Sequence, residues 1–402
     1  MTTTTPAGYD PLDPAVQADP YPYYVVLRRD DPVQFVSSLG AYVVSRHADV
    51  RQVLHDGATF SNEAMAQLVS RAVDFGEEVV AQPAPVSIIG ADGEQHARLR
   101  MIVNRGFTPR RVALLEREMR AMARPYLDRL VERGAGDLQA DFAVPFPTVV
   151  IATMLGVDPE LRDEFRRWAE HMILAVFEPD AADRADEIGQ SGEQMDEWLD
   201  SVIAERAGRD GDDLISMLLR AELEGGALSH EELRVFVFTL LVAGSITTAY
   251  LIGNAANTLA RTPQLAARAR ADRALIPPLV EESLRHDAPA QMMFRTATRN
   301  VELAGSVVPK GATVVALLGS ANRDHTVFVD PDAFRIERDN RDNLAFGHGA
   351  HYCLGAALAR LEARVALEQL LAHASHFEPA GEGDRVSSLV FRGPTHLPMW
   401  FR

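Results

Sequence analysis

The feature that most constrains this chain is a block of helical periodicity that fills its middle. From about residue 95 to residue 274, apolar side chains recur at the three- and four-residue spacing of amphipathic helices. The clearest predicted helices span residues 111–132, 163–177, 192–206 and 231–261. So much helix leaves little chain for strands, and the sequence therefore predicts a mainly α protein.

The predicted strands form separate short sets on either side of that block. Residues 21–54 combine a short helix with a strand pair that turns at Gly40. Residues 294–322 alternate like short strands between glycines and prolines, and the last predicted helix, 355–373, precedes a strand-like tail. This distribution favours a mainly α fold with small β-sheets over a doubly wound α/β fold.

Composition limits the class of protein. The chain has 402 residues, 47% of them hydrophobic, which is enough for one large domain or for two to three ordinary ones. The excess of helix over short strand sets favours one large domain over residues 1–402, with residues 1–20 at its surface. A formal net charge of −17 argues against a nucleic-acid partner. The start lacks the features of a secretory signal, and the longest apolar run, near residues 235–243, is shorter than the ~20 residues of a membrane span. We therefore expect a cytoplasmic monomer that binds neither nucleic acid nor membrane.

The only cysteine, Cys353, lies in a glycine-rich loop directly before a predicted helix. A lone cysteine excludes an intramolecular disulfide, fits a reducing compartment and is most often a small buried hydrophobe. Here the N–H groups at the helix start are expected to lower the pKa of the thiol. Gly347, Gly349 and Gly355 let the backbone approach a bulky planar partner. Without a second cysteine nearby, a soft metal is favoured over disulfide exchange and over zinc.

The loop "FGHGAHYCLG", residues 346–355, resembles the heme-binding loop of the cytochromes P450, F-x-x-G-x-H-x-C-x-G. The resemblance runs from about residue 19 to the C-terminus. It implies the cytochrome P450 fold and heme b (iron protoporphyrin IX), with the Cys353 thiolate as the ligand of the iron. The loop residues implied to hold the cofactor are Phe346, Gly347, His351, Cys353 and Gly355, and Gly349 completes the motif.

Glu282 and Arg285 stand three residues apart, where opposite charges meet on one helical face. Alone, this spacing indicates an ordinary surface ion pair of little energetic value. The two residues resemble the E-x-x-R pair of the family, and Arg338 is similar to the arginine that completes it. The resemblance implies a buried network that folds the chain around the heme.

His96 and Arg100 stand four residues apart on one helical face, a spacing that two solvated side chains would also show. They resemble the H-x-x-x-R pair that crosses the heme propionates in the family. Arg295 and His351 are implied to share that role, since carboxylates are bound best by cationic donors, above all by bidentate arginine.

The most apolar predicted helix contains weak helix formers at its centre, where Ala243 and Gly244 are followed by three residues with hydroxyl groups. A bend that serves only packing is one interpretation. The stretch resembles the oxygen-binding segment of the family, which implies that Ala243 lies beside the heme and that Gly244 leaves room for O2 and substrate. Ser245, Thr247 and Thr248 are then expected to deliver protons, and the Thr247 hydroxyl to bond the Ala243 carbonyl group.

Ile246 departs from this pattern, because the family usually has Asp or Glu there and an alkyl group relays no proton. The leading hypothesis is a heme-thiolate monooxygenase in which hydroxyl groups and water carry the protons. It would insert one oxygen atom of O2 into an apolar small molecule of terpenoid, steroid, fatty-acyl or polyketide type. The alternatives are a peroxide-driven peroxygenase, a P450 that catalyses isomerisation or coupling, and, from another class, a heme protein that senses ligands without turnover.

Substrate-contacting segments of the family correspond here to mostly aliphatic residues with flexible methionines, which favours an apolar, medium-sized substrate. The candidates are Val86, Ile88, Ile89, Thr239, Val242, Ala243, Gln291, Met292, Met293, Val390 and Phe391.

No reductase domain is evident, so the resemblance implies electrons from a separate ferredoxin or flavodoxin with its reductase. We expect arginines near the cysteine-side face to dock this acidic partner, because opposite charge steers association. Scattered, solvated arginines are the alternative. The predicted docking arginines are Arg98, Arg105, Arg110, Arg111, Arg341, Arg360 and Arg364.

Overall fold

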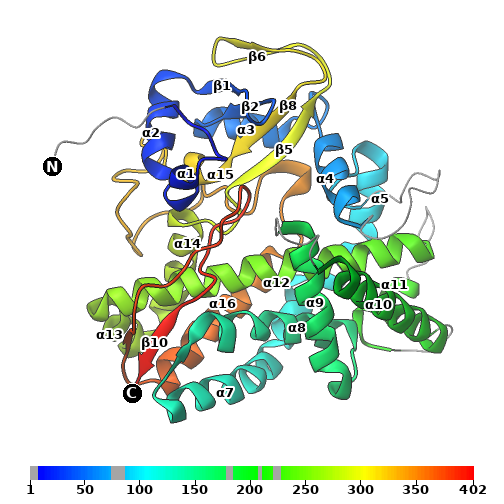
Figure 1. The fold of residues 1–402 in the computed structure, drawn as a ribbon, viewed down its shortest axis with the longest axis vertical. Coiled ribbons are helices and arrows are strands. Elements are labelled where there is room, and N and C mark those ends of the chain that lie inside the picture. Colours follow the sequence, from blue (N-terminus) through cyan, green and yellow to red (C-terminus); the bar gives the residue numbers. More distant parts are fainter. Residues whose placement is uncertain (1–7, 74–86, 178–183, 207–210, 221–227) are drawn as a thin grey trace.

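The computed structural model describes residues 8–73, 87–177, 184–206, 211–220 and 228–402. A sheet-bearing part stands above a larger helical part, which the long helix α12 crosses (Figure 1). The helices are α1 (Pro14–Ala18), α2 (Tyr21–Asp30), α3 (His47–His55), α4 (Glu63–Val73), α5 (Gly93–Asn104), α6 (Pro109–Leu114), α7 (Glu116–Arg133), α8 (Pro145–Leu155), α9 (Arg162–Phe177), α10 (Ala185–Arg206), α11 (Leu214–Leu219), α12 (His230–Arg261), α13 (Pro263–Ala271), α14 (Ile276–His286), α15 (Leu318–Ala321) and α16 (Ala356–His373).

The helices agree with the predicted periodicity except at two boundaries. The predicted helix at 111–132 is divided into α6 and α7, which meet at Leu115. The helix predicted from residue 192 begins earlier, at Ala185, although Gly189 and Gly192 weaken it. A β-carbon at Gly192 would lie 3.8 Å from the Cε of Met172 on α9, so close packing against α9 supports this turn of α10.

The strands fall into three small sheets, as the sequence predicted. The first has five strands in the order β1-β2-β8-β5-β3, the second has the order β4-β10-β9, and the third pairs β6 with β7. In the first sheet β2 runs parallel to β8, and Ala41 pairs with Thr313. The strands are β1 (Val33–Val36), β2 (Ala41–Val44), β3 (Phe60–Ser61), β4 (Ala135–Asp137), β5 (Met292–Ala297), β6 (Val301–Leu303), β7 (Ser306–Val308), β8 (Thr313–Leu317), β9 (Phe377–Pro379) and β10 (Pro398–Phe401).

Helix α12 is the central helix of the helical part. A capping box starts it: the Ser229 hydroxyl accepts from the Glu232 N–H at 3.1 Å, and the Glu232 carboxylate accepts from the Ser229 N–H at 2.9 Å. The helix then packs against α8, α14 and α16. These neighbours bury most of its side chains, which explains why it is the most apolar helix.

Helix α12 also corrects the membrane argument made from the sequence. By length and composition it is apolar enough to cross a membrane, and it is the one such helix in the described part of the chain. The longest uninterrupted apolar run, near residues 235–243, is much shorter than the apolar part of the helix, so it underestimated the apolar length of α12. However, 72% of its most apolar window is buried inside the protein, as in the core helix of a soluble protein.

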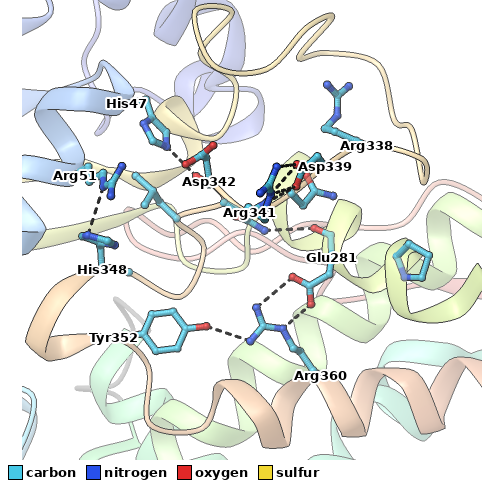
Figure 2. A pocket seen from close by; sticks show the side chains of 15 residues that line it. His47, Arg51, Glu281, Arg338, Asp339, Arg341, Asp342, His348, Tyr352 and Arg360 are labelled. Carbon is cyan, nitrogen blue, oxygen red and sulfur yellow. Dashed lines mark hydrogen bonds and ion pairs between the residues drawn. The ribbon is translucent and has the colours of Figure 1, made fainter.

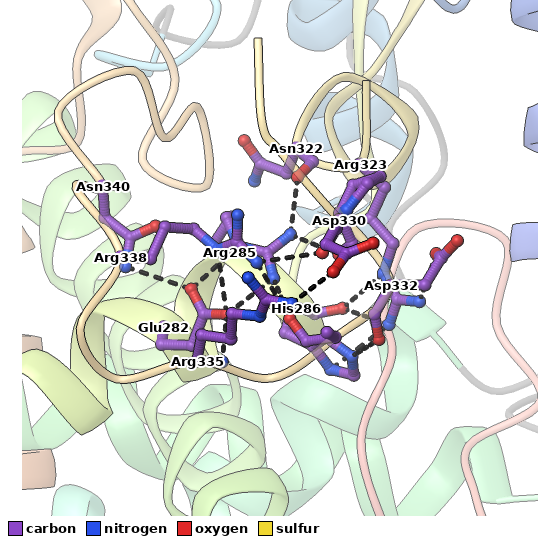
Figure 3. A network of polar contacts seen from close by, with 12 residues as sticks. Glu282, Arg285, His286, Asn322, Arg323, Asp330, Asp332, Arg335, Arg338 and Asn340 are labelled. Atoms are coloured by element: carbon purple, nitrogen blue, oxygen red, sulfur yellow. Dashed lines mark hydrogen bonds and ion pairs between the residues drawn. The ribbon is translucent and has the colours of Figure 1, made fainter. Parts of the chain in front are cut away.

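A buried network of charges fastens α14 to the loop that precedes Cys353 (Figure 3). Glu282 and Arg285 are both fully buried, and Arg285 Nη2 donates to Glu282 Oε1 at 2.7 Å. Arg338 Nε donates to the same oxygen at 3.2 Å, and Asn340 Nδ2 donates to Oε2 at 3.1 Å. The backbone N–H of Arg335 also donates to Oε1, at 2.8 Å. The carboxylate thus has partners on both oxygens, and the interpretation as a surface ion pair is wrong.

The environment of Glu282 keeps it ionised. Burial alone would raise the pKa of this carboxyl group. The hydrogen bond and charge of Arg285, with the donors from Arg335 and Asn340, outweigh burial and hold the pKa below its usual range. Arg285 also donates to the carbonyl oxygens of Asn322, Pro331 and Ala333, which ties the loop to α14.

Candidate active site

The loop before Cys353 is held tightly against α3. Gly347 and Gly349 have φ angles of 73° and 75°, the left-handed conformation that favours glycine. A β-carbon at Gly349 would lie 3.0 Å from the carbonyl oxygen of Leu54, so no larger residue fits beside α3. The Cys353 N–H donates to the Phe346 oxygen at 2.9 Å, which closes the loop and presents the sulfur just before α16.

The protonation of Cys353 differs from the sequence-based expectation. The Gly355 N–H donates to the sulfur and, with Arg100 and Arg360, lowers the pKa of the thiol. Burial acts in the opposite direction and is larger, so the net pKa is raised rather than lowered. Coordination of a metal removes the thiol proton directly, and a sulfur that accepts an N–H bond suits that role.

Four side chains that are cationic or can become so converge beside this loop, from α5, β5 and the loop itself. The rings of His96 and His351 lie 3.9 Å apart between centroids. Burial, with the charges of His96 and Arg295, lowers the pKa of His351 to about 3, and burial lowers the pKa of Arg295 to about 10. Burial also lowers the pKa values of His96 and Arg100. Asp92 is a carboxylate near this cluster, and further negative charge would stabilise the buried guanidinium groups of Arg100 and Arg295.

Heme b fits this arrangement. Its two propionates would supply the negative charge, and His96 Nε2 is a buried nitrogen without a hydrogen-bond partner among the described residues. Gly355 gives a second observation, because a β-carbon built there meets no protein atom within 4 Å. Two residues after the cysteine, the chain thus leaves space in which a bound group can approach the backbone.

On α12, a side-chain hydroxyl group bonds a backbone carbonyl group near the middle of the helix. The Thr247 hydroxyl donates to the Ala243 carbonyl oxygen at 2.8 Å, as predicted from the sequence. Ala243 is exposed although most of the helix around it is buried. The hydroxyl and the exposed turn share one helical face, since the two residues are four apart.

Gly244 has a different role from the one predicted. A β-carbon there would lie 2.8 Å from Cδ1 of Ile151 on α8. The missing side chain therefore allows α8 to approach α12 closely, and it does not make room for oxygen. Packing density explains the glycine, because the neighbouring Ile151 is fully buried.

The comparisons with known proteins agree with this geometry. The family model described as Cytochrome P450 matches residues 35–388. The putative cytochrome P450 123 of Mycobacterium tuberculosis is 37% identical over 97% of this chain and 96% of its own length. The erythromycin C-12 hydroxylase of Saccharopolyspora erythraea is 36% identical over 93% of this chain and 92% of its own. The structure of cytochrome P450 CYP109Q5 from Chondromyces apiculatus superposes with a TM-score of 0.89 and 38% identity, covering 98% of both chains.

This chain belongs to the cytochrome P450 family. It is therefore a monooxygenase that binds heme b and acts on a small molecule, in a family whose reaction uses O2 and a redox partner. The P450 fold accounts for the separate short sheets and for the central position of α12.

Sequence reasoning missed one buried polar residue of this P450, Glu362 on α16. It is 1% exposed, and its carboxyl group forms a hydrogen bond with Thr248 on α12. Helical periodicity could have indicated this burial, because Glu362 stands four residues after Leu358 and three before Val365. It therefore lies on the same buried face of α16 as these two residues. Charged neighbours at Arg360 and Arg364 hid it within an alternation typical of a solvated face.

The predicted substrate residues divide into two groups around β5. Met293 and Arg295 share one face of the strand, as successive odd positions must. Met292 points to the opposite face, where it packs in the cluster with Tyr24 and Leu317, so its assignment to the substrate pocket is wrong.

Gln291 is also a structural residue in this P450. Its amide Nε2 donates to the Ala288 oxygen at 2.7 Å, and its Oε1 accepts from the Tyr24 hydroxyl at 3.4 Å. Its backbone N–H donates to the Val390 oxygen at 2.8 Å. These bonds fix the junction between α14 and β5, and they leave the side chain no free polar group for a substrate.

The other candidates are placed as follows. Thr239 and Val242 are buried on α12, and the Thr239 hydroxyl has no hydrogen-bond partner in the described ranges. Ile88 and Ile89 are half-buried in the turn before α5, and Val86 lies outside the described residues. Phe391 packs near Tyr250 of α12, with ring centroids 6.5 Å apart. Val390 packs against the cluster that contains Tyr24 and Leu317.

A polar cavity of about 450 Å³ opens on the cysteine side of this P450, between α3, α14 and the loop before Cys353 (Figure 2). His47 and Arg51 line it from α3, and Arg341 and Arg360 from the other side. Arg360 pairs with Glu281 and donates to the Tyr352 hydroxyl at 3.1 Å.

Several of the predicted docking arginines are engaged in salt bridges or hydrogen bonds within the chain. Arg98 pairs with Glu232, Arg341 with Asp339, and Arg364 with Glu116 and Glu368. Arg111 donates to the Asp212 backbone oxygen at 2.7 Å. Arg105 and Arg110 are exposed near the start of α6.

Proposed function

We propose that this P450 inserts one oxygen atom of O2 into an unactivated bond of an apolar molecule, with electrons from a separate ferredoxin or flavodoxin and its reductase. The observation that carries the proposal is the Thr247 hydroxyl, which bonds the Ala243 oxygen on an exposed face of α12. Such a bond holds the hydroxyl group on the exposed face and competes with the backbone hydrogen bond of that carbonyl group, which favours water binding there. When bound, the heme iron with its Cys353 ligand supplies the binding and cleavage of O2.

The residues of the cationic cluster would hold this cofactor. Arg100 and Arg295 are proposed to bind the propionates as charged donors, and His96 and His351 to bind them through ring N–H groups. Asn62 Nδ2 donates to His351 Nε2 at 2.9 Å, which orients that ring. Phe346, Gly347 and Gly355 are proposed to shape the loop around the cofactor, and Cys353 to bind its iron.

The substrate is proposed to be an apolar, medium-sized skeleton of terpenoid, steroid, fatty-acyl or polyketide type. Aliphatic residues of α12, with Ile88, Ile89, Met293 and Phe391, support this class, because apolar linings bind apolar ligands. A relative named for hydroxylating erythromycin supports the polyketide member of the class.

The chain is proposed to act as a cytoplasmic monomer with one domain over residues 1–402. Its partner is proposed to dock on the cysteine side, near the polar cavity and the exposed Arg105 and Arg110. Neither arginine has a salt bridge within the described ranges, so both offer charge for steering an acidic partner.

Ile246 favours one second candidate, a peroxide-driven reaction or an isomerisation or coupling that needs no delivered protons. Its side chain is buried and carries no proton. A non-catalytic sensor is not proposed, because the family is one of monooxygenases.

Two measurements test the proposed function. The reduced protein with carbon monoxide should show the red-shifted absorption band of a thiolate-bound heme, and a band at the position of a histidine-bound heme would overturn the Cys353 assignment. Product formation from apolar compounds that shift the heme to high spin is then compared with redox partners and O2 or with peroxide alone. Faster turnover with peroxide alone would replace the leading proposal with the second candidate.

A further inference from the structure

The turn formed by residues 385–394, which we call the C-terminal turn, carries Phe391 of the proposed substrate lining. It rises from the helical part toward β5 (Figure 1). Its two legs are adjacent, since Arg385 and Pro394 form an antiparallel β-bridge. Residues 385–391 are exposed or half-buried, so apolar burial contributes little to holding them in place. Hydrogen bonds and charges therefore position this turn.

One carboxylate, that of Asp287 at the end of α14, binds both legs of the C-terminal turn. Arg385 Nη1 donates to Asp287 Oδ2 at 3.1 Å, and Arg392 Nε donates to Oδ1 at 2.8 Å. The Tyr21 hydroxyl also donates to Oδ1, at 2.8 Å. Burial would raise the pKa of this carboxyl group, but the charges of Arg385 and Arg392 hold the pKa below its usual range. The clamp is therefore ionic at neutral pH.

Arg392 is the buried member of the clamp, with a side chain that is 11% exposed. Its Nη1 donates to the oxygens of Ala18 and Gln17, at 2.9 and 3.3 Å, in the last turn of α1. Its Cζ atom lies 5.3 Å from the centre of the Tyr21 ring. Removing one partner of a buried ion pair leaves an uncompensated charge, so loss of the Asp287 charge should displace the Arg392 side chain.

Phe391 directly precedes Arg392 and brings the C-terminal turn to α12. Its ring lies 6.5 Å from that of Tyr250, measured between centroids. Tyr250 stands three residues after Thr247, and the two therefore share a helical face. A β-carbon at Gly393 would lie 2.2 Å from the Tyr250 ring, so the turn lies directly against α12. A displacement of Arg392 should therefore shift Phe391 along α12.

We propose that Asp287 is a positioning residue for the substrate, because its carboxylate sets where Phe391 stands beside α12. It acts through Arg385 and Arg392 and does not itself touch the substrate. The inference rests on the proposed place of Phe391 in the substrate lining. The N-terminal segment takes part, since Tyr21 and the end of α1 are bonded to the same clamp.

Two ligands of the heme iron test this proposal without turnover. Imidazole fills little of the pocket, whereas 4-phenylimidazole carries a second ring that should meet Phe391. In Asp287→Asn the dissociation constant of 4-phenylimidazole, measured from the heme absorption, should rise about tenfold, the usual cost of a lost apolar contact in a pocket. That of imidazole should stay unchanged. Asp287→Glu restores the charge and should recover most of the affinity, which a role of the exact side-chain shape would not permit.

Asp137→Asn is the matched control, because Asp137 holds the same C-terminal segment a few residues further on. Its Oδ1 accepts from the Leu397 N–H at 2.9 Å, and its Oδ2 bonds the His396 ring at 2.8 Å. This variant should loosen the segment without moving Phe391, so the ratio of the two dissociation constants should not change. An equal change of that ratio in Asp137→Asn and Asp287→Asn would indicate general loosening and would overturn the proposal.

Milder variants decide the question if Asp287→Asn does not fold. Tyr21→Phe and Arg385→Gln each remove one bond to Asp287 and leave Arg392 its counter-ion. Each should weaken the binding of 4-phenylimidazole and leave that of imidazole unchanged. An unchanged ratio of the two dissociation constants in both variants would overturn the proposal.

Phe391→Ala separates this inference from the proposed function. If Phe391→Ala leaves the binding of 4-phenylimidazole unchanged, the proposed lining is wrong and the inference fails with it. If Phe391→Ala weakens that binding and folded Asp287→Asn does not, the lining stands and the positioning role of Asp287 is wrong.

Discussion

Two buried polar regions of this P450 differ in how completely their polar atoms are hydrogen-bonded. Around Glu282, both carboxylate oxygens accept bonds from four donor groups, and the neighbouring Arg285 is bonded as fully. Between α12 and α16, Glu362 Oε1 and the Ser245 hydroxyl have no partner within the described chain. A saturated network resists change, whereas an unsaturated one can exchange protons and water. The first region is therefore expected to govern stability and the second to govern reactivity.

The largest expected effect is on the saturated network. Glu282→Ala should destabilise the folded protein by about 3–5 kcal/mol, because it leaves the buried Arg285 and Arg338 without their counter-ion. Urea denaturation of the heme-bound protein measures this. Glu337→Gln, which removes an exposed partner of Arg268, is the control and should leave the midpoint nearly unchanged. Equal midpoints for the two variants would contradict the comparison.

The same network should give stability a defined pH dependence. The pKa of Glu282 is lower in the folded than in the unfolded state, so its contribution is complete above the unfolded value of about 4.3. It is lost as pH falls through the lower folded pKa, by up to about 1.4 kcal/mol for each pH unit. Denaturation midpoints between neutral pH and pH 3 test the sign. Glu282→Gln should flatten the profile, and an equally steep profile in that variant would assign it to other groups.

Gly244→Ala should have an intermediate effect on stability, of about 1–3 kcal/mol, through overpacking against Ile151. Ile151→Val removes the methyl group nearest to the new β-carbon, so the double variant should recover much of the loss. Thermal denaturation of the four forms completes the cycle. Strict additivity would indicate that Gly244 does not serve the contact between α8 and α12.

Thr247→Val should change stability by less than about 1 kcal/mol, because the hydroxyl bonds a carbonyl within its own helix. Its effect on reactivity should be larger, since product per electron with O2 falls by about tenfold or more when a proton-delivering hydroxyl is lost. Consumption of reductant measured beside product gives this ratio. Thr153→Val on α8, where the hydroxyl also bonds the carbonyl four residues back, controls for the change in helix geometry.

The smallest effect on stability is expected for Ser245→Ala. The hydroxyl has no partner among the described residues, so its removal should be neutral within about 1 kcal/mol. Only the product formed per electron with O2 should fall, and by less than in Thr247→Val, because a water molecule can replace the Ser245 hydroxyl group. A marked loss of stability would show that the Ser245 hydroxyl group makes a stabilising hydrogen bond, as the groups around Glu282 do.

The sequence predicted the architecture well wherever local patterns decide it. Periodicity located α9, α12 and α16 closely, and glycine and proline placed the short strands. It did not predict that β2 pairs with β8, because alternation describes one strand and not its partner.

The site was predictable to the extent that motifs specify chemistry. The spacing around Cys353 and the i to i+4 bond of Thr247 follow from local geometry, and the structure also brings His96, Arg100, Arg295 and His351 together. Gly244 was misassigned, because what a missing side chain avoids depends on another helix. Met292 was misassigned because strand alternation gives two faces without saying which one meets the substrate.

The pairing of β2 with β8 has a consequence for synthesis on the ribosome. Ala41 cannot pair with Thr313 until Thr313 has been translated. At about 5–20 residues per second, the interval between the synthesis of these two residues is on the order of tens of seconds. During that interval β2 lacks the neighbour that it has in the finished sheet. Cys353 emerges later still, so the cysteine loop is completed only after the strands beside it have been made. Arrest of translation before residue 313 should thus leave a chain exposed to aggregation through an open strand edge.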